Sequence, residues 1–134
     1  MLCAFAVLLM ACNGRNKAEE RVFEMQLGKY VLDTSKTILT GYEHQAGLYN
    51  KLEVVFNADS TFRLNMQVPF IYDSAGKWKA GDGTPYSYNE LIFGNGITDQ
   101  FYPPYSGDSI FLLNSGTPKA GARSVNEIYF RKIK

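Results

Sequence analysis

Apolar residues recur at every second position along much of the chain after Gln26, which is the pattern of half-buried β-strands. The clearest run extends over 61–68. Its apolar side chains, which share one face, are Phe62, Leu64, Met66 and Val68. A similar run covers 51–56, and the intervening 57–60 consists of Asn, Ala, Asp and Ser, which favour a turn. We therefore predict a β-hairpin over 51–68.

Further segments show strand-like alternation between clusters of turn-forming residues. These strands are expected at 27–32, 77–79, 88–93, 109–114 and 125–133. The turn clusters lie at 73–76, 81–83, 94–96, 106–108 and 115–118. Trp78 is expected to point inward between two solvated lysines. The connection over 34–50 holds either a short strand or a helical turn, and no segment shows the sustained 3.6-residue repeat of a helix.

Short strands at regular spacing are typical of an antiparallel meander that closes into a barrel or packs as a sandwich. We predict an all-β fold, a small antiparallel meander barrel of about eight strands, because closure removes exposed strand edges. A β-sandwich is the alternative. The composition agrees with either, since 9 Phe and 9 Tyr suit strands while 12 Gly and 5 Pro suit turns.

The first eleven residues form an apolar, uncharged run that is too short to cross a bilayer, which takes about 20 residues. Leu9-Met10-Ala11 leads directly into Cys12, and this tetrapeptide resembles the lipobox of bacterial lipoproteins. The resemblance implies cleavage before Cys12 and acylation of its thiol. It departs from the usual signal peptide in that no Lys or Arg precedes the apolar run. The alternative is an N-terminal core helix with an incidental cysteine.

The lipobox interpretation divides the chain into three parts. We expect a signal peptide over 1–11, the lipidated cysteine with a polar tether over 12–25, and a β-barrel domain over 26–134. Acyl chains contribute about 0.8 kcal/mol of membrane affinity per buried methylene, so the membrane contact would belong to the lipid. The expected location is the bacterial cell envelope, on the periplasmic or the surface side of the outer membrane.

Gly28-Lys29-Tyr30 on the first predicted strand resembles the Gly-x-Trp opening of lipocalins, with Tyr30 in place of Trp. In that family a basic residue of the last strand packs across the aromatic ring, and Arg131 would fill that place. The chain is similar to the small lipocalin-like lipoproteins common in Bacteroidota. Fatty-acid-binding relatives hold a carboxylate with an Arg-x-Tyr pair, whereas Glu127 precedes Tyr129 here. The resemblance therefore implies the fold more than the ligand.

Charge and residue usage exclude several classes of function. The chain has 14 basic and 13 acidic residues, so no basic excess is available to bind nucleic acid. Cys3 and Cys12 are the only cysteines, which excludes disulfides and cysteine-based zinc sites within 13–134. His44 is the single histidine, and no nucleophile or phosphate-binding motif accompanies it. We expect no catalytic residues, no metal and no cofactor.

The richest candidate for ligand binding is the aromatic segment 85–105. One interpretation is a rim at a barrel mouth or a platform that stacks on sugar rings, formed by Tyr86, Tyr88, Phe101, Tyr102 and Tyr105. The other is that these rings belong to the core and to a loop folded over the barrel end. A hollow barrel would present a cavity lined by Phe62, Leu64, Met66, Trp78 and Tyr88.

Three tripeptides resemble the Asp-Ser/Thr-apolar sequence at which exported Bacteroidota proteins are O-glycosylated. Their hydroxyl residues are Ser60, Ser74 and Ser109, all at predicted turns, where Asp-Ser is also ordinary turn chemistry. The resemblance makes them candidate modification sites.

Two functions fit these features better than an enzyme does. The first is a lipid-anchored exported binding protein for a small apolar or amphipathic ligand, or for a glycan. The second is a non-enzymatic accessory lipoprotein with a filled core and no small ligand. The state of the barrel interior distinguishes them, because a ligand pocket of the first kind is largely apolar and enclosed.

Overall fold

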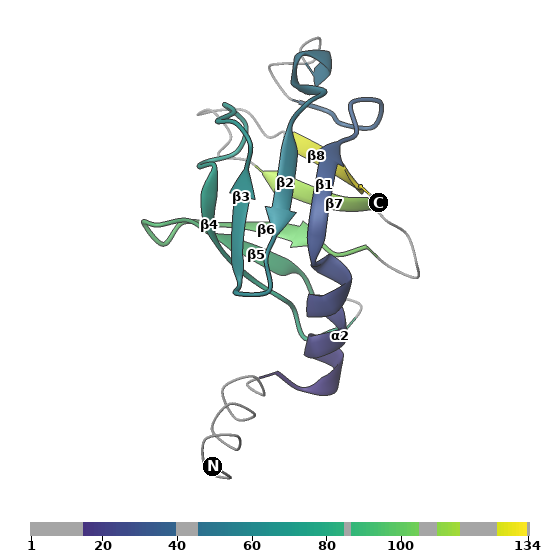
Figure 1. The fold of residues 1–134 in the computed structure, drawn as a ribbon, viewed down its shortest axis with the longest axis vertical. Coiled ribbons are helices and arrows are strands. Elements are labelled where there is room, and N and C mark those ends of the chain that lie inside the picture. The colour runs from purple at the N-terminus through teal and green to yellow at the C-terminus, as the bar shows by residue number, and fades with distance from the viewer. Residues whose placement is uncertain (1–14, 40–45, 85–86, 105–109, 116–125, 134) are drawn as a thin grey trace.

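The computed structural model describes residues 15–39, 46–84, 87–104, 110–115 and 126–133. They form a closed barrel of eight antiparallel strands in sequential order, in which the last strand pairs with the first (Figure 1). The strands are β1 (Gly28–Leu32), β2 (Glu53–Phe56), β3 (Thr61–Leu64), β4 (Ala75–Lys79), β5 (Asn89–Ile92), β6 (Thr98–Tyr102), β7 (Ile110–Ser115) and β8 (Asn126–Lys132). The predicted meander barrel is confirmed, and the alternative of a sandwich is wrong.

The predicted hairpin is present as β2 and β3, with Phe56 opposite Phe62. Its turn is closed by Asp59, whose carboxylate accepts hydrogen bonds from the backbone N–H (3.0 Å) and the hydroxyl (2.6 Å) of Thr61. Strand β3 ends at Leu64, four residues earlier than expected. The strand ends where the side-chain amide of Asn65 bonds to the backbone around the start of β2. Its oxygen accepts a hydrogen bond from the backbone N–H of Glu53 (2.8 Å), and its nitrogen donates one to the backbone carbonyl of Lys51 (2.8 Å).

Strand β6 is the one strand that the alternation did not predict. Only Phe101 among its five residues is a fully buried apolar side chain, and the other inward position holds Asp99. Its place is fixed by register with two neighbours, because Phe101 pairs with Asn89 of β5 and with Leu113 of β7. Tertiary pairing therefore makes a strand of a segment whose own pattern is weak.

The expectation of a polar tether is wrong for the residues that immediately precede the barrel. They form helix α2 (Lys17–Gln26), whose first turn is capped by Asn16, which accepts a hydrogen bond from the backbone N–H of Glu19 (2.8 Å). The buried positions of the helix are Phe23 and Gln26. With one aromatic ring and one amide as its buried positions, the segment lacks the 3.6-residue repeat of apolar residues that predicts a helix. A helix of this length also needs tertiary packing to form.

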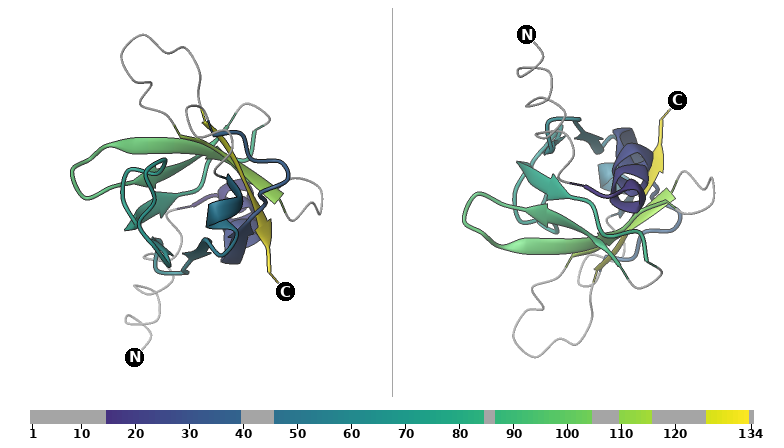
Figure 2. Two further views of the ribbon diagram at one scale, coloured as in Figure 1. Left: turned by 90° about the horizontal axis from the view of Figure 1, so that it is seen from above. Right: turned by 90° about the horizontal axis from the view of Figure 1, so that it is seen from below.

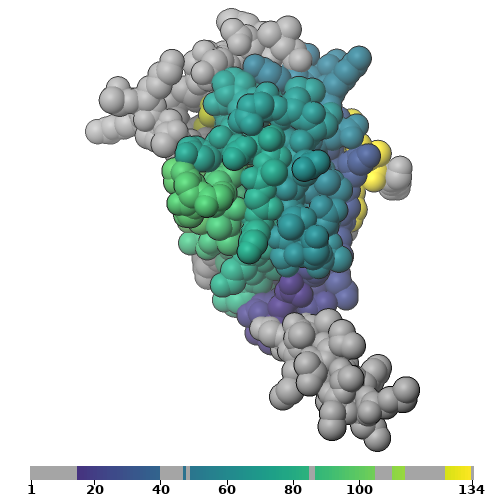
Figure 3. Space-filling view, turned by 60° about the vertical axis from the view of Figure 1, so that its left-hand side comes forward, coloured from purple at the N-terminus to yellow at the C-terminus, as the bar shows by residue number. Residues whose placement is uncertain are grey.

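Helix α2 packs against one end of the barrel, at the bottom of Figure 1, and Figure 3 shows purple atoms of the N-terminal part directly against the teal atoms of the barrel. Figure 2 views the barrel from both ends. The long connection after β1 holds a helical turn, the 3₁₀ helix η1 (Ala46–Tyr49). It also holds a single bridge between Ile38 and Glu127 of β8. Of the two alternatives left open for 34–50, the helical turn is present, and the described residues there form no strand beyond this one bridge.

Candidate functional site at the helix-capped end

Four of the five side chains expected to line a cavity belong to the barrel core or pack against it. The indole of Trp78 stacks on Phe23 of α2, with ring centres 4.5 Å apart, and meets Phe56 edge-on at 5.4 Å. Phe62 meets Phe93 edge-on at 5.8 Å. Leu64 is buried and Met66 is partly buried against the same core. Helix α2 supplies the ring that sequence patterning missed, because a single Phe in a charged segment gives no periodic signal.

The centre of the barrel is an aromatic cluster around Phe111. Its ring stacks on Phe130 at 5.0 Å and lies 4.8 to 5.5 Å from the rings of Tyr30, Phe56 and Phe101. Each of these side chains is at most 2% exposed. Rings of this size in mutual contact fill a small barrel as a packed core rather than enclose an open cavity.

The aromatic segment 85–105 divides between the inside and the outside of the barrel. Phe101 belongs to the core, whereas Tyr88 and Tyr102 are exposed. The expectation that Tyr88 lines a cavity inside the barrel is wrong, because it directly precedes Asn89, the inward-facing first residue of β5, and so points outward. Tyr86 and Tyr105 lie outside the described residues, as do Cys12, His44 and Ser109.

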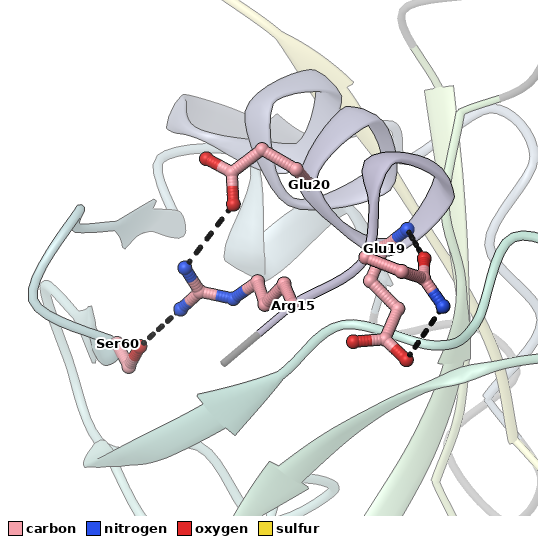
Figure 4. A network of polar contacts seen from close by, with 5 residues as sticks. Arg15, Glu19, Glu20 and Ser60 are labelled. Carbon is pink, nitrogen blue, oxygen red and sulfur yellow. Dashed lines mark hydrogen bonds and ion pairs between the residues drawn. The ribbon is translucent and has the colours of Figure 1, made fainter. Parts of the chain in front are cut away.

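Arg15 holds the start of α2 against the barrel (Figure 4). Its guanidinium lies 3.7 Å from the ring centre of Phe23, forms an ion pair with Glu20 at 3.5 Å and donates a hydrogen bond to the hydroxyl of Ser60 at 3.2 Å. The Ser60 hydroxyl is therefore engaged in helix docking. Ser74, the other described candidate for glycosylation, is partly buried just before β4.

A basic residue of the last strand does pack over Tyr30, but it is Lys132 and not Arg131. Lys132 lies opposite Tyr30 in the register of β1 and β8, with its ammonium 5.7 Å from the ring centre. Arg131 precedes Lys132 on the same strand, so its side chain points to the opposite face of the sheet, where it is exposed. The Tyr30 hydroxyl donates a hydrogen bond to the backbone carbonyl of Gln26 (2.9 Å), and burial raises its pKa.

Two clefts lie between α2 and the loop that joins β4 to β5. The first, of about 330 Å³, is lined by Glu19, Lys79, Ala80, Gly81, Asp82, Thr84, Ser87, Tyr88 and Glu90. The second, of about 290 Å³, has α2 residues on one wall and Asn89 and Pro103 on the other. The sequence interpretation identified Tyr88 here but not the surrounding polar groups, which carry no motif.

The joining loop is held in place by hydrogen bonds among its own residues. The Asp82 carboxylate accepts hydrogen bonds from the backbone N–H (2.9 Å) and hydroxyl (2.8 Å) of Thr84, which lower its pKa. The Ser87 hydroxyl accepts a hydrogen bond from the Asp82 backbone N–H (2.8 Å). Gly83 adopts a φ of +84°, and a Cβ there would lie 3.0 Å from Ala18 of the helix. Of these residues, Asp82, Thr84 and Ser87 line the first cleft, and Gly83 and Ala18 line the second.

Two amide side chains beside this end of the barrel are fully buried. The Asn89 carbonyl oxygen accepts a hydrogen bond from the Gly81 backbone N–H (2.8 Å), while its Nδ2 has no partner among the described residues. Both polar atoms of the Gln26 side chain are likewise without a partner there. An amide group that is buried without a hydrogen-bond partner costs stability.

The described residues contain no group of three or more His, Cys, Asp or Glu side chains placed to hold a metal ion. None of the helices in that part of the chain is long and apolar enough to span a membrane. Comparisons with models of protein families, with curated proteins and with solved structures gave no match. The closed eight-stranded antiparallel meander is consistent with a lipocalin-like fold.

Proposed function

We propose that this protein is a lipid-anchored, exported protein of the bacterial cell envelope that binds through its outer surface and catalyses no reaction. The anchor would be acylated Cys12, in the manner of the small lipocalin-like lipoproteins common in Bacteroidota. The lipobox-like Leu9-Met10-Ala11-Cys12 supports the anchor. The stacked rings of the barrel interior support a filled core over an enclosed ligand pocket.

The filled core is the observation that carries this choice. An apolar ligand would need a space of a few hundred cubic ångströms inside the barrel. That interior holds the cluster around Phe111 together with the Trp78–Phe23 stack. Both rings of that stack are buried, so the helix and the strands complete one core.

Metabolic labelling with radioactive palmitate tests the anchor. We expect the full chain expressed in a bacterium to incorporate label and to fractionate with membranes, and Cys12→Ser to abolish both. Cys3→Ser is the matched control, since Cys3 would be removed with the leader. Label that persists in Cys12→Ser, or that is lost only in Cys3→Ser, would overturn the anchor.

Titration with a fluorescent fatty acid tests the filled core. We expect no saturable one-to-one binding of cis-parinaric acid and no quenching of Trp78 at the concentrations that saturate a lipocalin-type pocket. Saturable one-to-one binding would show that the core opens and that the binding-pocket alternative is right.

A further inference from the structure

We propose that the outer face of strands β5 to β8, together with the cleft of about 330 Å³ at its edge, binds a neutral glycan. This inference rests on the surface-binding part of the proposed function and is independent of the lipid anchor. It concerns side chains that point away from the barrel core.

An aromatic row crosses this face. Tyr102 of β6 pairs in register with Leu112 of β7, which pairs with Tyr129 of β8. Asn89 of β5 pairs with Phe101, so Tyr88, one residue before Asn89, lies beside Tyr102. Tyr88 and Tyr102 are 36% and 37% exposed, and Leu112 and Tyr129 are partly exposed. With strands about 4.8 Å apart, the row extends for about 14 Å.

A row of hydrogen-bonding groups runs beside the aromatic row. Glu90 of β5 pairs with Gln100 of β6, and the backbone of β7 at position 114 pairs with both Gln100 and Glu127, which places Glu127 of β8 in the same line. The side chains of Glu90, Gln100 and Glu127 each lie two residues along their strand from a member of the aromatic row, which is about 7 Å on the same face. The face therefore offers aromatic surface and polar groups in parallel lines.

The cleft continues the rows at their β5 end, because Tyr88 and Glu90 both line it. Glu19 of α2 also lines it, as do Thr84 and Ser87 of the joining loop. Lys79 pairs with Glu90 in the register of β4 and β5, yet among the described residues neither side chain forms an ion pair. A ligand in the cleft would therefore meet both the Lys79 ammonium and the Glu90 carboxylate.

The chemistry of this surface fits a neutral sugar. Tyrosine presents an apolar ring face with a polar tip, which suits the apolar face and rim hydroxyls of a pyranose. Carboxylates and amides accept and donate hydrogen bonds to hydroxyls. The cleft is lined by the carboxylates Glu19, Asp82 and Glu90 against the single ammonium of Lys79, so it repels anionic ligands. A cleft of this volume suits one or two sugar units, with the chain continuing along the tyrosines.

Isothermal titration of the full chain in detergent tests the inference, with maltohexaose, cellohexaose, xylohexaose, mannohexaose and N-acetylchitohexaose as neutral probes and a hexagalacturonate as the anionic probe. We expect one-to-one binding of at least one neutral probe. Tyr88→Ala and Tyr102→Ala should each weaken it about tenfold, the effect of removing a central aromatic contact. Tyr88→Phe should retain most of the affinity, and Glu90→Gln should lower it.

Tyr72→Ala is the matched control, because Tyr72 is also an exposed ring but lies at the other end of the barrel against Phe93. It should bind as the natural protein does. Circular dichroism of each variant checks that it is folded. The inference is overturned if no neutral probe binds, if only the hexagalacturonate binds, or if binding survives both alanine substitutions in the tyrosine row. Palmitate labelling of Cys12 is unaffected by any of these outcomes, so the two proposals fail separately.

Discussion

At the scale of single residues, the helix-capped end depends on one aromatic stack. Phe23 is buried between Trp78 and the guanidinium of Arg15. Neither the Phe nor the Arg could be assigned from the sequence, because both lie in a segment of mostly charged residues. Trp78 was predicted to point inward, and it does, since it alternates with exposed Lys77 and Lys79.

Phe23→Ala should lower the free energy of unfolding by about 3 to 5 kcal/mol, the usual cost of removing a buried Phe. Urea unfolding followed by circular dichroism measures this loss. The fluorescence of Trp78, the only tryptophan, should also shift to longer wavelength in the folded variant as its indole meets water. Ile97→Ala, at an exposed position, is the control and should change stability by less than about 0.5 kcal/mol. A Phe23→Ala protein as stable as this control would contradict the stack.

The inward-facing carboxyl of Asp99 should make the stability of the protein depend on pH. It shares the inward side of β6 with Phe101, and burial raises the pKa of its carboxyl to about 6. The folded state then holds the proton more tightly than the unfolded chain. The free energy of unfolding should therefore fall as pH rises from about 4 to about 6. Urea midpoints across this range should show that fall, and Asp99→Asn should remove it. An identical pH profile in the variant would refute this assignment.

At the scale of elements, the sequence predicted strands where apolar residues alternate and missed the elements that depend on neighbours. The hairpin of β2 and β3 was predictable because Phe56, Phe62 and Leu64 all face inward. Strand β6 was not, because its inward positions are Asp99 and Phe101. Helix α2 was not, because its buried face consists of Phe23 and Gln26.

Close packing of β4 against its neighbours depends on Gly76. A Cβ at this position would collide with the backbone carbonyl of Ile92 and lie 2.8 Å from the ring of Phe62. Gly76→Ala should therefore cost about 1 to 3 kcal/mol of stability, the range for overpacking. Gly94→Ala is the matched control, since nothing lies within 4 Å of its added methyl. Thermal or urea unfolding compares them, and equal stability of the two variants would be inconsistent with the close approach.

At the scale of the whole molecule, docking of α2 shortens the expected tether. The described chain begins at Arg15, which is already bound to the barrel. Arg15 lies three positions after Cys12 in the sequence, and three extended residues span at most about 11 Å. An acyl anchor at Cys12 would thus hold the helix-capped end near the bilayer and direct the opposite end away from it.

Fluorophores attached at Asp82→Cys and Asn95→Cys should report this orientation. Asp82 lies in the loop packed against α2, and Asn95 lies in the turn between β5 and β6 at the far end. Residues 13–134 contain no other cysteine, so each label is unique after cleavage. In vesicles with spin-labelled lipid, the label at position 82 should be quenched more strongly than that at 95. Equal quenching, or stronger quenching at 95, would contradict the short tether.

The sequence by itself determined the all-β meander, the inward side of most strands and the hairpin turn, because these follow from alternation and turn chemistry within a few residues. Only the tertiary structure decided that α2 caps the barrel, that Lys132 and not Arg131 covers Tyr30, and that Tyr88 and Tyr102 face outward beside Leu112 and Tyr129. These features arise where strands or a helix far apart in sequence meet. The alternation of apolar and polar residues predicts whether a side chain faces into or out of the barrel. It does not predict which residue of a distant strand or helix that side chain will contact.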